Sequence, residues 1–131
     1  MSRVIDFPKI HDIRGNLSFI EYPLHVPFEV KRVFWTYDVP GGESRGGHAY
    51  FVQEEIIIAL SGSFDVVITH QDGTKDIFTL NRSYYGLYIP PHTWRHMENF
   101  STNSLGLHLC STVYSVSDYI RDFNQFFETY E

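Results

Sequence analysis

One stretch of the chain, Gly42–Gly62, decides the fold, and it reads GESRGGHAYFVQEEIIIALSG. It combines a glycine-rich start, two ring-bearing side chains at His48 and Tyr50, and an apolar run that follows Glu55. Residues two apart on a β-strand point to the same face of the sheet. We therefore expect His48 and Tyr50 to project together from one strand into the interior of a sheet structure.

On both sides of this stretch, turn residues separate short apolar segments, a pattern typical of an all-β protein. The segments expected to be strands are Arg3–Phe7, Asn16–Tyr22, Val30–Tyr37, Glu55–Ser61, Ser63–Thr69, Asp76–Leu80, Tyr84–Ile89, Thr93–Asn99 and Ser104–Ser111. The pair Asp72-Gly73 predicts a tight hairpin turn, because glycine adopts a positive φ without cost. Many strands with short connections predict an antiparallel sandwich or barrel.

The C-terminal segment Val116–Tyr130 has a different period. Its apolar residues are spaced three and four apart, which favours one face of a helix. These residues are Tyr119, Ile120, Phe123, Phe126, Phe127 and Tyr130. Ser117 is the expected N-cap, with Asp118 in the first turn. We expect a short C-terminal helix that packs on the barrel or on a partner chain.

Length and composition indicate one globular domain that spans residues 1–131. The net charge of −6 and the absence of a basic run argue against nucleic-acid binding. No stretch has the roughly 20 apolar residues of a membrane span, and we expect no signal peptide. The single cysteine, Cys110, lies in an apolar run, so a buried thiol in a reducing, cytoplasmic setting is expected.

The stretch Gly42–Gly62 resembles the first motif of the cupins, G-x5-H-x-H-x3,4-E-x6-G. Gly42, His48, Glu55 and Gly62 match that spacing, and Tyr50 stands where the second histidine would be. The second cupin motif is matched only in part, by Pro91, His96 and Asn99. The resemblance implies a jelly-roll, or double-stranded β-helix, fold with its working site inside the barrel.

Cupins often hold a metal, so a metal site has to be weighed. His48, Glu55 and His96 could supply two imidazoles and a carboxylate, the facial set of non-haem iron enzymes. However, Tyr50 is a poor ligand unless it is deprotonated. His96 also points away if its neighbour Arg95 points inward, because neighbours on a strand face opposite ways. We therefore expect no metal and no cofactor, and we keep a metal-dependent cupin dioxygenase as an alternative.

The segment Arg45-Gly-Gly-His48-Ala-Tyr50 resembles the R-G-x-H-A-H signature of the sugar-nucleotide 3,4-ketoisomerases. Further short motifs extend the resemblance over nearly the whole chain, among them Asp12–Leu17, Lys31–Trp35, Gly86–Ile89 and Asp118–Arg121. The resemblance implies a metal-independent isomerase of dTDP-4-keto-6-deoxyglucose in the synthesis of 3-amino-3,6-dideoxyhexoses. It also implies a homodimer, with N-terminal strands such as Arg3–Phe7 open to exchange between subunits.

The family reaction moves a ketone from C4 to C3 through an enediol or enediolate. By this resemblance His48 is the catalytic acid and base, a role that suits imidazole because its pKa lies near neutral. Tyr50 replaces a family histidine. A phenol with a pKa near 10 is a weak base, but it can donate a proton or a hydrogen bond to the enolate. Loss of activity with retained sugar-nucleotide binding is the second alternative.

Eight side chains are expected to bind the substrate. Guanidinium groups bind phosphate oxygens in pairs, and aromatic rings stack on a base or line a sugar pocket. The arginines are Arg14, Arg32, Arg45 and Arg95, and the aromatic residues are Trp35, Tyr37, Tyr88 and Trp94. Trp35 and Tyr37 share a strand face, and Trp94 neighbours Arg95, so not all eight can face one ligand. The remaining histidines have no motif context, and most of them are expected at the surface or in turns: His11, His25, His70, His92 and His108.

Overall fold

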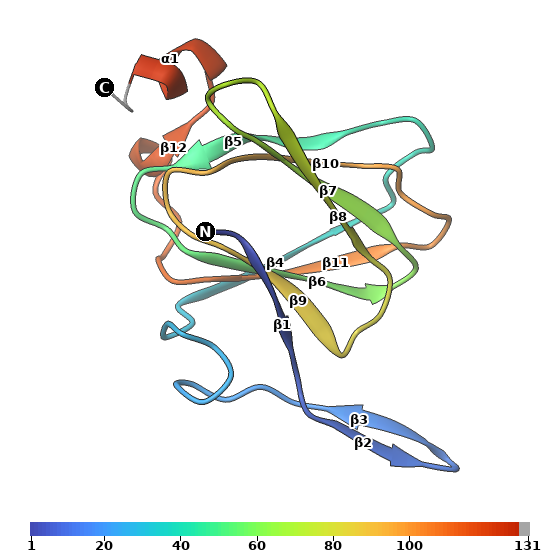
Figure 1. The fold of residues 1–131 in the computed structure, drawn as a ribbon. Coiled ribbons are helices and arrows are strands. Elements are labelled where there is room, and N and C mark those ends of the chain that lie inside the picture. The colour runs from blue at the N-terminus through green and yellow to red at the C-terminus, as the bar shows by residue number, and fades with distance from the viewer. Residues whose placement is uncertain (129–131) are drawn as a thin grey trace.

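The computed structural model describes residues 1–128 and consists of two five-stranded antiparallel sheets that face each other (Figure 1). The first sheet runs in the order β1 (Arg3–Asp6), β9 (Tyr85–Ile89), β6 (Glu55–Ser61), β11 (Leu105–Cys110) and β4 (Arg32–Tyr37). The second runs β12 (Tyr119–Ile120), β5 (Arg45–Tyr50), β10 (Trp94–Glu98), β7 (Phe64–Thr69) and β8 (Lys75–Leu80). The expected all-β, jelly-roll class is confirmed.

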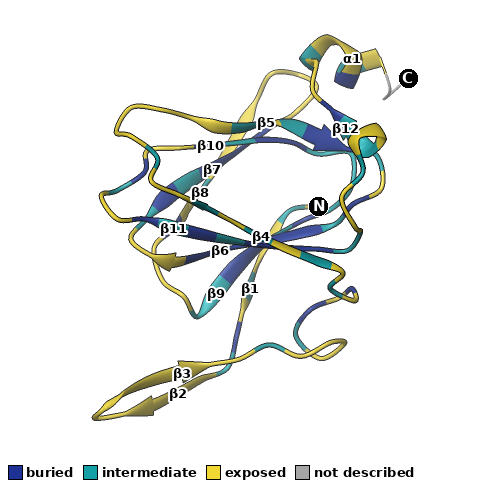
Figure 2. Ribbon diagram, turned by 180° about the vertical axis from the view of Figure 1, so that it is seen from behind, coloured by how far each residue is buried: buried dark blue, intermediate teal, exposed yellow. Residues whose placement is uncertain are grey.

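The apolar side chains of the strands build the core between the sheets, and Figure 2 shows most residues of β6, β7 and β11 as buried. The central cluster consists of Ile57, Ala59, Phe64, Val66, Ile68, Leu80, Leu87, Ile89, Met97 and Phe100. Strand β6 is buried on both faces, because Ile56 and Ile58 pack outward against Val26 and Phe28. This double burial explains why β6 reads as a continuous apolar run rather than an alternating one.

The N-terminal region adds a hairpin that stands away from the barrel (Figure 2). It consists of β2 (Lys9–Asp12) and β3 (Gly15–Ser18), and every residue of both strands is exposed. We expected a strand over Asn16–Tyr22 and none between Phe7 and Asn16, so β2 was missed and the expected strand extends four residues beyond the end of β3. The Asp12 carboxylate accepts a hydrogen bond from the Arg14 backbone at 2.8 Å, and Gly15 follows with a φ of 145°. This tight turn lets β2 pair with β3.

The C-terminal helix is shorter than the sequence predicted. A 3₁₀ turn at Val116–Asp118 precedes β12, which pairs with the edge strand β5, and only Phe123–Glu128 forms the helix α1. Backbone pairing with β5 thus overrides the helical spacing. The N-cap is Asp122 rather than Ser117, because its carboxylate accepts from the backbone N–H of Asn124 at 2.8 Å. Tyr130 lies outside the described residues.

The helix packs on the barrel, as expected. The ring of Phe126 lies 5.7 Å from that of Trp94, which faces outward from β10. Asp118, just before β12, also fixes the C-terminal segment to the barrel, because its carboxylate accepts hydrogen bonds from the backbone N–H groups of Val52 and Gln53.

Residues 1–128 contain no helix with the length and apolar character that a membrane crossing requires.

Candidate active site

A cavity of about 230 Å³ opens between the two sheets and is the candidate active site. Strands β4, β5, β6, β10, β11 and β12 all contribute side chains to it. The lining residues are Phe34, Thr36, Arg45, Gly46, His48, Tyr50, Glu55, Ile57, Arg95, Met97, His108, Tyr119 and Arg121. Apolar side chains such as Ile57 and Met97 join it to the core, and polar or charged side chains such as Glu55 and Arg95 line other parts of it.

His48 and Tyr50 project together into this cavity from β5, as their spacing predicted. Their ring centroids lie 4.8 Å apart, with the ring planes at 76°, and the ring of Tyr119 packs beside both. Within residues 1–128, neither Nε2 of His48 nor the hydroxyl of Tyr50, both buried, has a hydrogen-bond partner within 3.5 Å. The cavity therefore presents one imidazole nitrogen and one phenol that are available to a ligand.

The surroundings shift the pKa values of His48 and Tyr50 in opposite directions. Burial and the positive charge of Arg95 lower the pKa of His48 to about 3. The imidazole is therefore neutral at pH 7 and able to accept a proton. Burial and the negative charge of Glu55 raise the pKa of Tyr50 above its ordinary value. The phenol therefore keeps its proton at neutral pH and acts as a hydrogen-bond donor.

A buried carboxylate, Glu55, forms the floor of the cavity, with an ion pair across the sheets. Its Oε1 accepts from Nη1 of Arg95 at 2.7 Å, and both side chains are 2% exposed. Nε of Arg95 donates to the Thr93 carbonyl at 3.1 Å. In the described part of the chain, buried Nη2 of Arg95 has no partner, so its N–H donors are available in the cavity.

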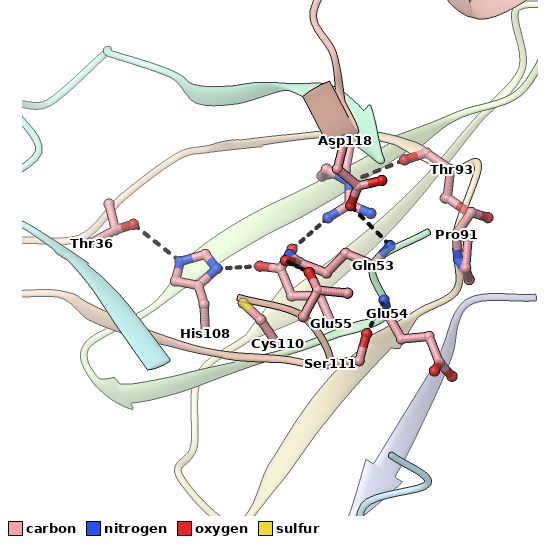
Figure 3. Close-up of polar contacts among 12 residues, drawn as sticks. Thr36, Gln53, Glu54, Glu55, Pro91, Thr93, His108, Cys110, Ser111 and Asp118 are labelled. Atoms are coloured by element: carbon pink, nitrogen blue, oxygen red, sulfur yellow. Dashed lines mark hydrogen bonds and ion pairs between the residues drawn. The ribbon is translucent and has the colours of Figure 1, made fainter. Parts of the chain in front are cut away.

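The second oxygen of Glu55 holds His108. Nδ1 of His108 lies 2.5 Å from Oε2 of Glu55, and Nε2 lies 3.1 Å from the hydroxyl of Thr36 (Figure 3). The imidazole is stacked on Phe34 with the rings 4.1 Å apart and 10° from parallel. Burial alone would raise the pKa of Glu55, but the hydrogen bond from His108 and the charge of Arg95 lower it below its ordinary value.

Four of the ten predicted site residues line this cavity: His48, Tyr50, Arg45 and Arg95. Arg32 lies close by at the start of β4, where its Nη2 donates to Oε1 of Gln53 at 3.2 Å. Because Arg95 points inward, His96 lies on the opposite face of β10, with Nε2 2.7 Å from Glu98. The set of His48, Glu55 and His96 considered for a metal is therefore not brought together.

The other five predicted residues lie outside the cavity of their own chain. Arg14 is exposed in the β2–β3 turn, 3.0 Å from Asp12. Trp35 and Tyr37 are 58% and 60% exposed on the outer face of β4, because Phe34 and Thr36 take the inner face. The remaining two residues pack elsewhere: Tyr88 donates to Glu54 at 2.6 Å, and Trp94 is buried under α1.

Sequence reasoning missed Thr36, His108, Tyr119 and Arg121. His108 is an exception to the expectation that most of these histidines lie at the surface or in turns, because it is 3% exposed on β11, opposite Phe34 and Ile57 in register. The available signal was its even spacing with Cys110 in an apolar strand, which puts both on one face. Cys110 is fully buried, as predicted, and this burial raises the pKa of its thiol to about 12.

Comparison with known proteins gives a consistent result. All of residues 1–131 match the FdtA family, described as WxcM-like, C-terminal. The TDP-4-oxo-6-deoxy-alpha-D-glucose-3,4-oxoisomerase of Aneurinibacillus thermoaerophilus is 38% identical over 125 residues, which cover 95% of this chain and 89% of that enzyme.

Two solved structures extend the similarity. A mutant of the 3,4-ketoisomerase QdtA from Thermoanaerobacterium thermosaccharolyticum, in complex with TDP-4-keto-6-deoxyglucose, matches with a TM-score of 0.95 and 32% identity, over 98% of this chain and 92% of that one. WlaRA, a TDP-fucose-3,4-ketoisomerase from Campylobacter jejuni, matches with a TM-score of 0.91 and 35% identity, over 99% and 96%.

Proposed function

We infer that this chain, which belongs to the FdtA family of WxcM-like proteins, is a 3,4-ketoisomerase of a TDP-linked 4-keto-6-deoxyhexose. The reaction moves the ketone from C4 to C3 and supplies a precursor for 3-amino-3,6-dideoxyhexoses. The observation that carries the inference is the pair formed by Nε2 of His48 and the hydroxyl of Tyr50, which face one cavity without partners in residues 1–128.

His48 is the proposed acid and base for the carbon protons. The ketone at C4 acidifies the C3 proton, which the neutral imidazole accepts. The electrons of the C3–H bond form the C3=C4 double bond, and negative charge develops on O4. When His48 returns the proton to C4, the double bond becomes the new ketone at C3. The lowered pKa leaves the His48 imidazole unprotonated at neutral pH but also makes it a weaker base than a free histidine, so donors that stabilise the charge on O4 must lower the cost of this step.

Tyr50 and Arg95 are the proposed stabilisers of the enediolate. Hydrogen-bond donors that are fixed in a buried site lower the cost of charge that develops in the reaction. The Tyr50 phenol keeps its proton, and Nη2 of Arg95 is unpaired within residues 1–128. Arg45 and Arg121 line the same cavity and supply positive charge for the diphosphate.

We propose a homodimer as the working form. The β2–β3 hairpin stands away from the barrel with apolar residues such as Ile10 and Leu17 exposed, so it is available for exchange with a second copy. Arg14 lies in the turn of this hairpin, outside the cavity of its own chain. Its predicted contact with substrate therefore depends on such an exchange. We place the enzyme in the cytoplasm, because a chain with one buried free cysteine suits a reducing compartment.

The test is NMR of TDP-4-keto-6-deoxyglucose incubated with the protein in D₂O. Deuterium should enter the sugar ring at C3 and C4 while the 3-keto product accumulates, and His48→Asn should abolish both signals. Calorimetric TDP binding without any deuterium uptake would instead indicate a binding protein that has lost turnover. Stoichiometric iron in purified protein, with activity lost on chelation, would indicate a metal-dependent enzyme.

A further inference from the structure

A hydrogen-bonded chain of three side chains joins one wall of the cavity to its floor, and the carbon-proton chemistry does not use it. The hydroxyl of Thr36 lies 3.1 Å from Nε2 of His108, and Nδ1 of His108 lies 2.5 Å from Oε2 of Glu55 (Figure 3). The residues come from three adjacent strands, β4, β11 and β6. All three line the cavity.

The order hydroxyl, imidazole, carboxylate is an arrangement for moving a hydroxyl proton. In it the imidazole exchanges a proton with the hydroxyl, while the carboxylate fixes the ring and stabilises its charged form. Here the carboxylate is itself held by Arg95, and the imidazole is held flat against Phe34. Thr36 is the most exposed of the three linked residues, whereas Glu55 and His108 are buried. A proton on the imidazole can therefore pass to a ligand in the cavity through the Thr36 hydroxyl.

The isomerisation needs such a carrier for its oxygen protons. Besides the proton that moves from C3 to C4, the oxygen O4 must gain a proton and O3 must lose one. His48 is occupied with the carbon proton during these steps. Tyr50 holds its own proton strongly, which suits a hydrogen-bond donor better than a group that gives its proton up.

We propose that Thr36, His108 and Glu55 form a relay that gives a proton to O4 and takes one from O3. This proposal rests on the proposed function. In the first half, His48 takes the C3 proton while the His108 imidazolium protonates Thr36, whose own hydroxyl proton passes to O4. In the second half, the O3 proton passes to Thr36 and one returns to His108 as C3=O forms, and His48 protonates C4. Both histidines end as they began.

The decisive variant is Thr36→Val, which removes the hydroxyl and keeps the shape of a β-branched strand residue. Two rates are measured by NMR in D₂O with TDP-4-keto-6-deoxyglucose: deuterium entry at C3 of recovered substrate and formation of the 3-keto product. His48 can still exchange the C3 proton in the variant, but the enediolate returns to substrate. Product formation should fall about 10²-fold, the scale of lost acid–base catalysis. Exchange at C3 and TDP affinity should stay within a few-fold.

Three further variants separate the relay from a general effect on the protein. Thr36→Ser restores the hydroxyl and should restore the ratio of product to exchange. Thr79→Val removes an exposed strand hydroxyl that donates to Asp65 at 2.7 Å, outside the cavity, and should leave both rates unchanged. His108→Gln keeps two polar contacts but carries no proton, so it should reproduce the Thr36→Val ratio. If His108→Gln does not fold, the comparison of Thr36→Val with Thr36→Ser tests the relay without it.

The outcomes distinguish the two proposals. A Thr36→Val protein with the wild-type ratio of product to exchange would overturn the relay alone. An equal fall in both rates would also overturn it, because Thr36 would then serve the carbon-proton step or substrate placement. If the unchanged protein shows neither exchange at C3 nor product, the proposed isomerase function is wrong, and the relay fails with it.

Discussion

Nη1 of Arg95 lies 2.7 Å from Oε1 of Glu55, and this fully buried ion pair connects the two sheets across the interior of the barrel. Glu55 comes from β6 in one sheet and Arg95 from β10 in the other. Removing one member of a buried pair leaves its partner as an uncompensated charge, which is costly in a medium of low polarity. The pair should therefore matter to stability as well as to the site.

We expect Glu55→Gln to lower the free energy of unfolding by about 3 kcal/mol, the scale measured when buried ion pairs lose one partner. Urea denaturation measures this change. The matched control is Asp12→Asn, which breaks the exposed pair with Arg14 and should leave the urea midpoint unchanged. An unchanged midpoint for Glu55→Gln would show that the neutral amide satisfies Arg95 and His108 equally well.

His48→Asn should reduce turnover about 10²–10⁴-fold, because no other described group in the cavity is a neutral imidazole with an unpaired nitrogen. Affinity for TDP should stay within a few-fold, since asparagine removes the base without adding charge. Steady-state kinetics and calorimetry measure the two quantities. The exposed His70→Asn is the control, and it should behave like the unchanged protein. Full activity of His48→Asn would remove His48 from the mechanism.

The pKa of His48 also predicts how stability depends on pH. The imidazole of the unfolded chain takes up a proton below pH 6.5, whereas in the fold it does so only near pH 3. The unfolded state therefore binds more protons in this interval, and the free energy of unfolding falls as the pH falls through it. Above pH 6.5 the contribution of His48 is constant. The slope is at most about 1.4 kcal/mol per pH unit.

Urea denaturation of the unchanged protein and of His48→Asn, at several pH values between 6.5 and 4.5, isolates this contribution. The charged and titratable groups that act on His48 are Arg95, Glu55, Arg121 and His108, and all remain in the variant. The unchanged protein should lose stability faster with acid than the variant does. Parallel pH dependences would mean that His48 takes up its proton equally readily in the fold and in the unfolded chain.

The sequence predicted those parts of the site that depend on spacing along one strand. His48 and Tyr50 lie two apart on β5 and meet in the cavity. Spacing cannot say which face of a strand is the inner one when both carry aromatic residues. On β4 it grouped Trp35 with Tyr37 correctly, but the structure turns Phe34 and Thr36 inward.

The rest of the site depends on contacts between strands that are far apart in the sequence. His108 has no motif of its own, and its role depends on Glu55, 53 positions away, and on Thr36, 72 positions away. The C-terminal segment shows the same limit. Its apolar spacing suits a helix, but Tyr119 lies opposite Tyr50 in an edge pairing that no local pattern contains.

The oligomeric state can be tested at the outer face of β4. Trp35 and Tyr37 are more than half exposed there, beside Leu60 at 44%, and such apolar patches mark interfaces. Light scattering at micromolar concentration should give twice the 15.3 kDa of the chain. Trp35→Lys should shift the mass toward the monomer, whereas Ile77→Lys, on the exposed side of β8, should not. A monomer mass for the unchanged protein would refute the dimer.

Tyr50 is where this chain departs from the family signature, and its hydroxyl can be tested by itself. Tyr50→Phe removes only that atom from a side chain that is 1% exposed, so the packing against His48 and Tyr119 is retained. If the phenol donates a hydrogen bond to the enediolate, turnover should fall about 10²-fold or more, the scale of one lost oxyanion donor. The urea midpoint should change little, because the hydroxyl has no partner within residues 1–128 to lose.

Tyr50→His restores the family pair and sharpens the test. An imidazole at this position can also donate a hydrogen bond, so the isomerase rate should be preserved or raised. The pH profile of turnover should change, because imidazole and phenol titrate about three units apart. Tyr84→Phe is the matched control, because this ring contacts Lys9 and Tyr85 outside the cavity and the variant should leave turnover unchanged. A silent Tyr50→Phe in an active enzyme would leave Arg95 as the donor to the enediolate, and the two-residue mechanism of His48 and Tyr50 would be wrong.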